Sequence, residues 1–104
     1  SLATAAILQT FEETGWHIAV DSVISIYCWQ VPDSGETFFR VAFTGRLLEH
    51  DPDHQLDEGI LRAVWMSPAE LQQAADQLRS PLVMRGIKDY LKNIRYPIDL
   101  IVDM

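Results

Sequence analysis

The sequence predicts a small α+β domain, and three observations lead to this prediction. A helical pattern opens the chain, two strand patterns joined by a turn follow it, and two helix starts come later. Because the two strand patterns are separated only by a short turn, we expect them to form an antiparallel hairpin that the helices cover.

Composition predicts a single globular domain spanning residues 1–104, with 48% hydrophobic and 22% charged residues. The formal net charge of −7 argues against a nucleic-acid polymer or an anionic membrane as the main partner. Cys28 is the only cysteine, which excludes an internal disulfide and fits a cytoplasmic setting. No apolar run approaches the roughly 18 residues of a membrane-spanning helix.

The first predicted helix covers residues 2–14. Ser1 is suited to be its N-cap, and Gly15 to end it in the left-handed conformation. The side chains expected on its buried face follow a spacing of three and four residues. They are Ala3, Ile7, Thr10 and Thr14.

The hairpin is predicted from residues 17–31 and 37–48, with a turn at Pro32-Asp33-Ser34-Gly35. Both alternating sets of side chains in the first strand are apolar, so we expect cover on both of its faces.

The remaining chain is predicted to form a polar loop over residues 50–59 and a short strand over residues 60–66. Ser67-Pro68 and Ser80-Pro81 each combine an N-cap residue with proline at the first helical position, so each begins a helix. The second of these helices ends at Tyr96-Pro97. Helical spacing places Asp89 on the water-facing side of this second helix.

An acidic pair closes the first helix. On a helix, Glu12 and Glu13 can share one edge with Gln9, three and four residues earlier. Oxygen ligands gathered in this way suit Mg²⁺ or Mn²⁺, although a solvated helix edge remains the alternative. His50 and His54 do not have the spacing of a closed zinc site, so we interpret them as part of a solvated loop.

Glu12, Glu13, Gly15 and Trp16 match E-E-x-G-U, the end of the Nudix signature, in which U is a bulky apolar residue. The chain therefore resembles the Nudix (MutT-like) hydrolase family. The Arg-Glu pair of that signature falls on Leu8-Gln9, and its glycine-rich first half is absent. The segments Thr37–Phe43 and Arg95–Ile101 are similar to the NudJ phosphatase group of this family.

This resemblance implies a Nudix-type α/β/α sandwich with a mixed sheet, from which the N-terminal strands are missing. It also implies Mg²⁺- or Mn²⁺-dependent hydrolysis of phosphate anhydrides in nucleoside di- or triphosphates or thiamine-type pyrophosphates. By resemblance, Gln9, Glu12 and Glu13 would hold the metal. Glu12, Glu13 and Glu58 would be catalytic, with Glu58 as general base or extra ligand. Because Leu8-Gln9 replaces Arg-Glu, a catalytically impaired module that binds a ligand or a protein is the alternative.

Three hairpin residues are candidates for substrate contact: Tyr27 and Trp29 for stacking on a ring, and Arg40 for a phosphate. Core packing is the alternative for the two aromatic residues. Without further strands the hairpin would expose an apolar edge, and such an edge pairs with another strand. We therefore expect either a homo-oligomer or an additional N-terminal part that covers this edge.

Overall fold

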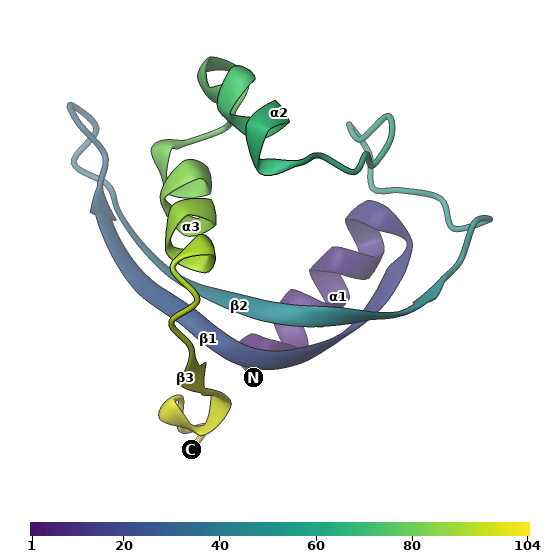
Figure 1. Ribbon diagram of the computed structural model, residues 1–104, viewed down its shortest axis with the longest axis horizontal. Coiled ribbons are helices and arrows are strands. Elements are labelled where there is room, and N and C mark those ends of the chain that lie inside the picture. Colours follow the sequence, from purple (N-terminus) through teal and green to yellow (C-terminus); the bar gives the residue numbers. More distant parts are fainter.

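A computed structural model describes residues 1–104 and confirms the α+β fold (Figure 1). One long curved hairpin carries helices along its length, and a short third strand lies near the C-terminus. The elements are α1 (Leu2–Thr14), β1 (Trp16–Gln30), β2 (Thr37–His50), α2 (Pro68–Gln73), η1 (Ala75–Gln77), α3 (Pro81–Leu91), β3 (Tyr96–Pro97) and η2 (Ile98–Leu100).

Helix α1 begins and ends at the predicted residues. The Ser1 hydroxyl accepts a hydrogen bond from the Thr4 N–H at 3.1 Å. At the other end, Gly15 has φ 78°, and its N–H donates to the Phe11 carbonyl at 2.8 Å. A Cβ on Gly15 would lie 2.9 Å from the Asp51 carbonyl oxygen, so glycine is required by both backbone conformation and space.

The sheet has the order β2-β1-β3, and both of its pairings within this chain are antiparallel. β1 pairs with β2 from Trp16–His50 to Gln30–Thr37. The register shifts three times in the first half of β1, and such irregularities bend and twist a strand pair. The hairpin is accordingly curved along its length (Figure 1).

The two later helices differ in how they begin. At α2, Ser67 is the N-cap that the sequence predicts, and together with Glu70 it forms a complete capping box. At α3, the Ser80 side chain caps nothing, and its hydroxyl oxygen is buried without a hydrogen-bond partner. The expected N-cap bond at Ser80 is therefore wrong, and proline at the first helical position is the remaining local start signal.

The predicted strand over residues 60–66 is wrong. This segment has no regular secondary structure, and the backbone groups of residues 61–66 form no hydrogen bond with another backbone group. Its apolar composition favours a strand, but a strand forms only when a neighbour supplies the other half of the ladder. No element of this chain lies in that position.

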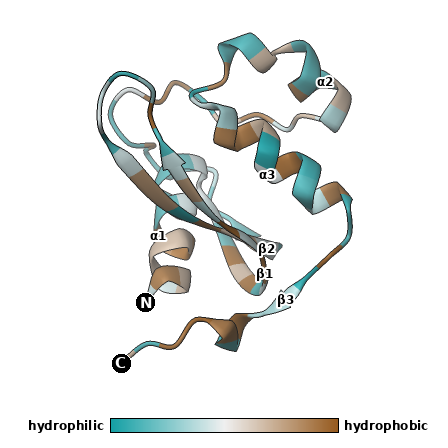
Figure 2. Cartoon of the chain, turned by 90° about the vertical axis from the view of Figure 1, so that its left-hand side faces the viewer, coloured by the Kyte–Doolittle hydropathy of each residue, from teal (hydrophilic) through white to brown (hydrophobic).

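The interior is small for a chain of this length. Val23 is the only hydrophobic residue that is fully buried, and the expected cover on both faces of β1 is wrong at Ile26 and Cys28, which are exposed. Brown apolar stretches alternate with polar ones along the hairpin and α3 (Figure 2). No helix is long and apolar enough to cross a membrane.

Candidate active site

The acidic pair lies at the C-terminal end of α1, with Gln9 one turn earlier. Glu12 and Glu13 are half-buried, while Gln9 is exposed. The Gln9 amide nitrogen lies 3.5 Å from a carboxylate oxygen of Glu13, so these two side chains share an edge of the helix as the spacing predicts. The structure therefore brings one carboxylate and one amide within reach of a common ligand, with a second carboxylate adjacent.

The loop after β2 is held against this end of α1. The Asp57 N–H donates to the Glu12 carbonyl oxygen at 3.2 Å, and His54 Nε2 lies 3.3 Å from the same oxygen. The rings of His54 and Phe11 are 4.3 Å apart. Interpreting this whole loop as solvated is therefore wrong at His54, whose packing against α1 has no local sequence signal.

Through this docking, Asp57, the neighbour of Glu58, is hydrogen-bonded to the backbone of Glu12. The Glu58 side chain itself is exposed. Gly59, with φ 89°, follows in a turn that the Ile60 N–H closes by donating to the Asp57 carbonyl oxygen at 3.0 Å. The geometry is compatible with Glu58 reaching a ligand held at the end of α1.

The side chains at this end of α1 offer few charged ligands for a metal ion. No group of three or more His, Cys, Asp or Glu side chains comes together anywhere in the chain. His50 instead lies 4.7 Å from the Trp16 ring. Two carboxylates and one amide oxygen nevertheless fit Mg²⁺, which commonly takes one or two protein carboxylates and completes its shell with water and substrate phosphates.

A cavity of about 660 Å³ lies beside the same end of α1. It extends from Thr10 and Thr14 on the helix to the loop segment at Val64 and Trp65. Trp16 and Trp65 meet edge to face in its wall, with ring centres 6.0 Å apart. The cavity lining includes neither Glu12 nor Glu13.

The three hairpin candidates lie elsewhere. Tyr27 and Arg40 are direct cross-strand partners and line a second cavity, of about 460 Å³, between the hairpin and α3. Trp29 stacks on Phe38 with ring centres 6.1 Å apart, and the Arg40 guanidinium lies 6.0 Å from the Phe38 ring. Tyr27 follows Trp16 by eleven residues of β1, or roughly 35 Å along the strand. The structure therefore does not bring these residues next to the acidic pair.

Tyr27 instead connects the hairpin to α3 through Asp89. Its hydroxyl donates to Asp89 at 2.6 Å, and Arg85 and Lys92 pair with the same carboxylate at 3.0 and 3.3 Å. Burial, followed by the Asp89 contact, raises the pKa of Tyr27 to about 12. The Tyr27 hydrogen bond in turn lowers the pKa of Asp89. The prediction that Asp89 faces water is therefore wrong, since only 12% of its side chain is exposed.

The comparisons with known proteins agree with this fold. A NUDIX hydrolase from Nitrosomonas europaea superimposes with a TM-score of 0.95 and 36% sequence identity, covering 100% of this chain and 70% of that protein. Phosphatase NudJ of Escherichia coli strain K12 and of Shigella flexneri is 35% identical over 103 residues, 99% of this chain. No family model matches the chain.

The chain therefore belongs to the Nudix hydrolase family. Within that family it is similar to the NudJ phosphatases. It spans 66% of the length of these curated relatives. The resemblance first indicated by Glu12, Glu13, Gly15 and Trp16 thus extends over nearly every residue of the chain.

Proposed function

We propose that this protein acts in the hydrolysis of phosphate anhydride bonds in small phosphorylated substrates, in the presence of Mg²⁺ or Mn²⁺. Nucleoside di- or triphosphates and thiamine-type pyrophosphates are the proposed substrate classes. The observation that carries the proposal is the acidic end of α1, held in a Nudix fold with the Asp57 loop bonded to it.

In this proposal Glu12 and Glu13 hold the metal, and Gln9 adds a neutral amide oxygen. A divalent cation held by these side chains would supply positive charge against the phosphoryl oxygens and would make a nearby water more acidic. Glu58 is the proposed general base, because its loop is fixed on the Glu12 carbonyl oxygen. The Asp57 hydrogen bond then keeps this base near the ligand and limits the conformations available to the loop.

Tyr27, Trp29 and Arg40 remain proposed substrate contacts, but their observed partners favour packing roles. The Tyr27 hydroxyl is engaged by Asp89, and both Trp29 and Arg40 lie against Phe38. Tyr27 and Arg40 also line a different cavity from the one beside the end of α1. The hydrolysis proposal therefore rests on the end of α1 and does not require these three residues.

The direct test is phosphate release from a panel of nucleoside and thiamine-type diphosphates, with Mg²⁺ or Mn²⁺, by this chain and its Glu13→Gln variant. Losing a metal ligand should cost more than the roughly 10- to 100-fold lost with an outer-shell partner. Glu36→Gln is the matched control, because Glu36 is exposed in the hairpin turn. Equal turnover by wild type and Glu13→Gln would contradict the proposed role of Glu13.

The second candidate function is ligand binding without hydrolysis. It is favoured by the absence of any cluster of three ionisable metal ligands and by the neutral Gln9 beside Glu13. This function predicts no phosphate release, together with Mn²⁺-dependent binding of a non-hydrolysable diphosphate analogue. That binding should be lost in Glu13→Gln and retained in Glu36→Gln.

We further propose that the 104 residues belong to a single domain of a cytoplasmic protein, and that neither a nucleic-acid polymer nor a membrane is among its partners. The net charge of −7 and the single Cys28 support this assignment. A nitrocellulose filter assay with DNA and RNA at low salt would contradict it if either polymer were retained. Low salt is the stringent condition, because electrostatic binding is strongest there.

A further inference from the structure

The loop after β2 is attached to the C-terminal end of α1 by backbone hydrogen bonds. The last carbonyl groups of a helix have no partner within the helix, and the loop supplies donors at this end. The Asp51 N–H donates to the Gly15 carbonyl oxygen at 2.9 Å, and the Asp57 N–H donates to the Glu12 carbonyl oxygen at 3.2 Å. Residues 51–57 are therefore held on the acidic end of α1 at both ends of the segment.

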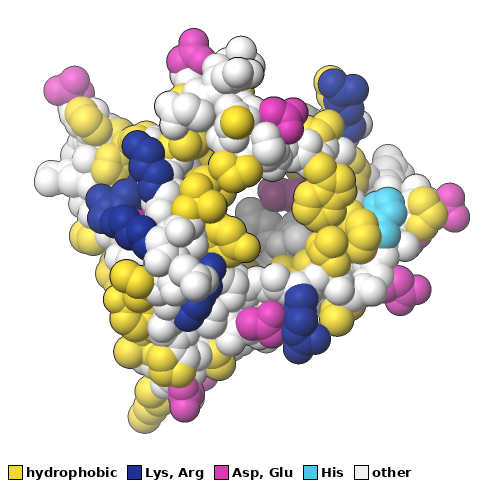
Figure 3. Space-filling view, in the orientation of Figure 1, with side chains coloured by type: hydrophobic (Ala, Val, Ile, Leu, Met, Phe, Trp, Pro, Cys, Tyr) yellow, Lys and Arg dark blue, Asp and Glu magenta, His cyan; other side chains and the backbone are white.

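The charge of this region opposes that attachment. Residues 51–58 include four acidic residues and no lysine or arginine, and they meet a helix end that carries Glu12 and Glu13. The partial negative charge at the C-terminal end of a helix adds to the repulsion. The ion pairs of the chain lie elsewhere, at Asp21 and Asp89. Lys and Arg side chains gather chiefly around α3, across the hollow that the space-filling view shows at the centre of the molecule (Figure 3). No lysine or arginine side chain therefore holds the loop on α1.

Contacts between aromatic rings oppose this repulsion, and they run through Phe11. Phe11 is half-buried on α1, directly before Glu12. The His17 ring of β1 stacks on it, with ring centres 4.2 Å apart and planes inclined by 18°. The His54 ring of the loop lies 4.3 Å from it, inclined by 42°. Such ring pairs stabilise beyond the area that they bury, so Phe11 joins α1, β1 and the loop at one point.

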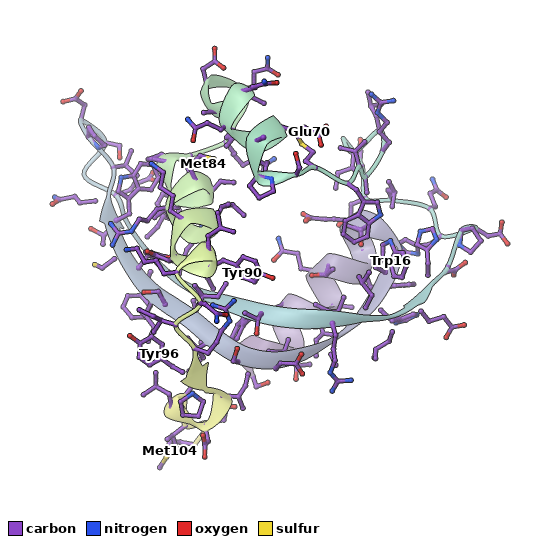
Figure 4. The ribbon with its side chains drawn as sticks, viewed as in Figure 1. Trp16, Glu70, Met84, Tyr90, Tyr96 and Met104 are labelled. Carbon is purple, nitrogen blue, oxygen red and sulfur yellow. The ribbon has the colours of Figure 1, made fainter.

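His54 adds a polar contact to this cluster of rings. Its Nε2 lies 3.3 Å from the Glu12 carbonyl oxygen, and because a carbonyl oxygen only accepts, the histidine donates. The same oxygen also accepts from the Asp57 N–H. A neighbouring ring pair, Trp16 and His50 with centres 4.7 Å apart, lies where α1 ends and β1 begins (Figure 4). His54 thus joins the middle of the loop to α1 by both its ring and its nitrogen.

We propose that Phe11, His17 and His54 are positioning residues, whose ring contacts fix residues 51–57 on the acidic end of α1. Glu58 directly follows this segment, so the rings limit where the proposed general base can lie. The catalytic effect of this positioning rests on the proposed hydrolysis, whereas the docking of the loop does not. The role requires none of the three side chains to touch substrate or metal.

Amide hydrogen exchange at Asp57, measured without divalent cations, tests the docking. Phe11→Leu keeps an apolar side chain and removes the ring. The Asp57 amide should then exchange about ten-fold faster, because its hydrogen bond opens whenever the loop leaves α1. Phe11→Tyr keeps the ring and should retain the protection. Phe39→Leu is the matched control, since Phe39 is 71% exposed on β2 and should leave Asp57 unchanged.

Steady-state kinetics of phosphate release from a nucleoside diphosphate, with Mg²⁺, tests the effect on catalysis. Phe11→Leu should lower kcat by about ten-fold or more and leave KM nearly unchanged, because a misplaced base slows the chemical step. Phe11→Tyr should recover kcat. Circular dichroism of every variant should match wild type, which separates lost positioning from lost folding.

His54→Gln is the second test variant, and it leaves α1 unchanged. Glutamine keeps a hydrogen-bond donor but removes the ring that lies against Phe11. The Asp57 amide should again lose protection, and kcat should again fall more than KM rises. This variant keeps the proposal falsifiable if Phe11→Leu fails to fold.

Two results would overturn the proposal. The first is unchanged protection of the Asp57 amide in both Phe11→Leu and His54→Gln. The second is lost protection with unchanged kcat, because the rings would then hold the loop without positioning a catalytic group. If wild type released no phosphate, the proposed hydrolysis would fail, and faster exchange at Asp57 in Phe11→Leu would still support the docking.

Discussion

At the scale of single residues, Gln9 is the position where the acidic end of α1 differs most from a charged metal site. Its amide lies 3.5 Å from Glu13, so Gln9→Glu would place a third carboxylate on the same edge. We expect Mn²⁺ affinity to rise by about 10- to 100-fold, measured by isothermal titration calorimetry. Repulsion between the carboxylates should make the metal-free variant less stable.

The control for Gln9→Glu is Gln73→Glu, which adds the same charge at an exposed position on α2. Its Mn²⁺ affinity should equal that of wild type. If Gln9→Glu lost stability without gaining Mn²⁺ affinity, the end of α1 would be a solvated acidic edge and not a metal site.

Tyr27 gives a second prediction at this scale. Its pKa is raised to about 12, chiefly by burial and then by Asp89, above an unfolded value of about 10. Its contribution to the free energy of unfolding is therefore complete below pH 10 and is lost as the pH rises toward 12. Tyr27→Phe should cost about 1–2 kcal/mol at pH 8, measured by urea denaturation, and this difference should shrink above pH 10.

Tyr90→Phe is the control, because the Tyr90 ring lies against Arg95 and is 46% exposed. It should leave the pH dependence of unfolding intact. An equal loss in both variants, with no dependence on pH, would contradict the role given to the Tyr27–Asp89 hydrogen bond.

These two residues also show where local sequence reasoning works. Gln9 and Glu13 are four residues apart, so helix geometry alone predicted their proximity. Tyr27 and Asp89 are 62 residues apart, and helical spacing placed Asp89 among the water-facing side chains. Its burial depends on how α3 packs against β1, which no local pattern specifies.

At the scale of elements, most predictions with a local signal succeeded, and the N-cap bond expected at Ser80 is the exception. The Ser1 and Gly15 caps, the turn after Pro32 and the capping box at Ser67 each act within a few residues. The strand over residues 60–66 failed because a strand is defined by its partner, and this chain contains none for it. In the structure, the apolar residues of this stretch form an exposed segment without regular secondary structure.

Gly15 allows the junction between α1 and β1 to be tested. Gly15 and Gly35 both have positive φ, at 78° and 74°, but only Gly15 lacks room for a Cβ. Gly35→Ala should therefore cost about 1–2 kcal/mol of unfolding free energy from backbone strain alone. Gly15→Ala should cost more, because Asp51 and the loop that follows it must move. Urea denaturation of both variants measures the difference.

The two glycine variants should also differ in the proposed activity. Displacing Asp51 disturbs the loop that carries Asp57 and Glu58, so Gly15→Ala should lower phosphate release. Gly35→Ala should leave phosphate release unchanged, because Gly35 lies at the far end of the hairpin. Equal losses of stability in the two variants would mean that the loop after Asp51 moves without a cost in free energy. Glycine would then be needed at position 15 only for its backbone conformation.

At the scale of the whole molecule, the fold class followed from the order of elements, and the family followed from one short motif and the similarity around it. Neither the order of elements nor the short motif predicted the open centre of the molecule. Sequence patterns predict which residues are apolar, but whether they are covered depends on the complete set of elements present. The apolar residues of β1 and of the 60–66 segment predict a core that this chain only partly encloses.

This open architecture predicts an unusual response to denaturant. The slope of unfolding free energy against urea concentration, the m-value, is proportional to the surface exposed on unfolding. With 7975 Å² already accessible when folded, the chain buries roughly a fifth less surface than a compact domain of equal mass. Its m-value, measured at low micromolar concentration, should be lower by about the same fraction. An m-value equal to that of a compact domain would contradict this prediction, because it would mean that the chain closes its own centre in solution.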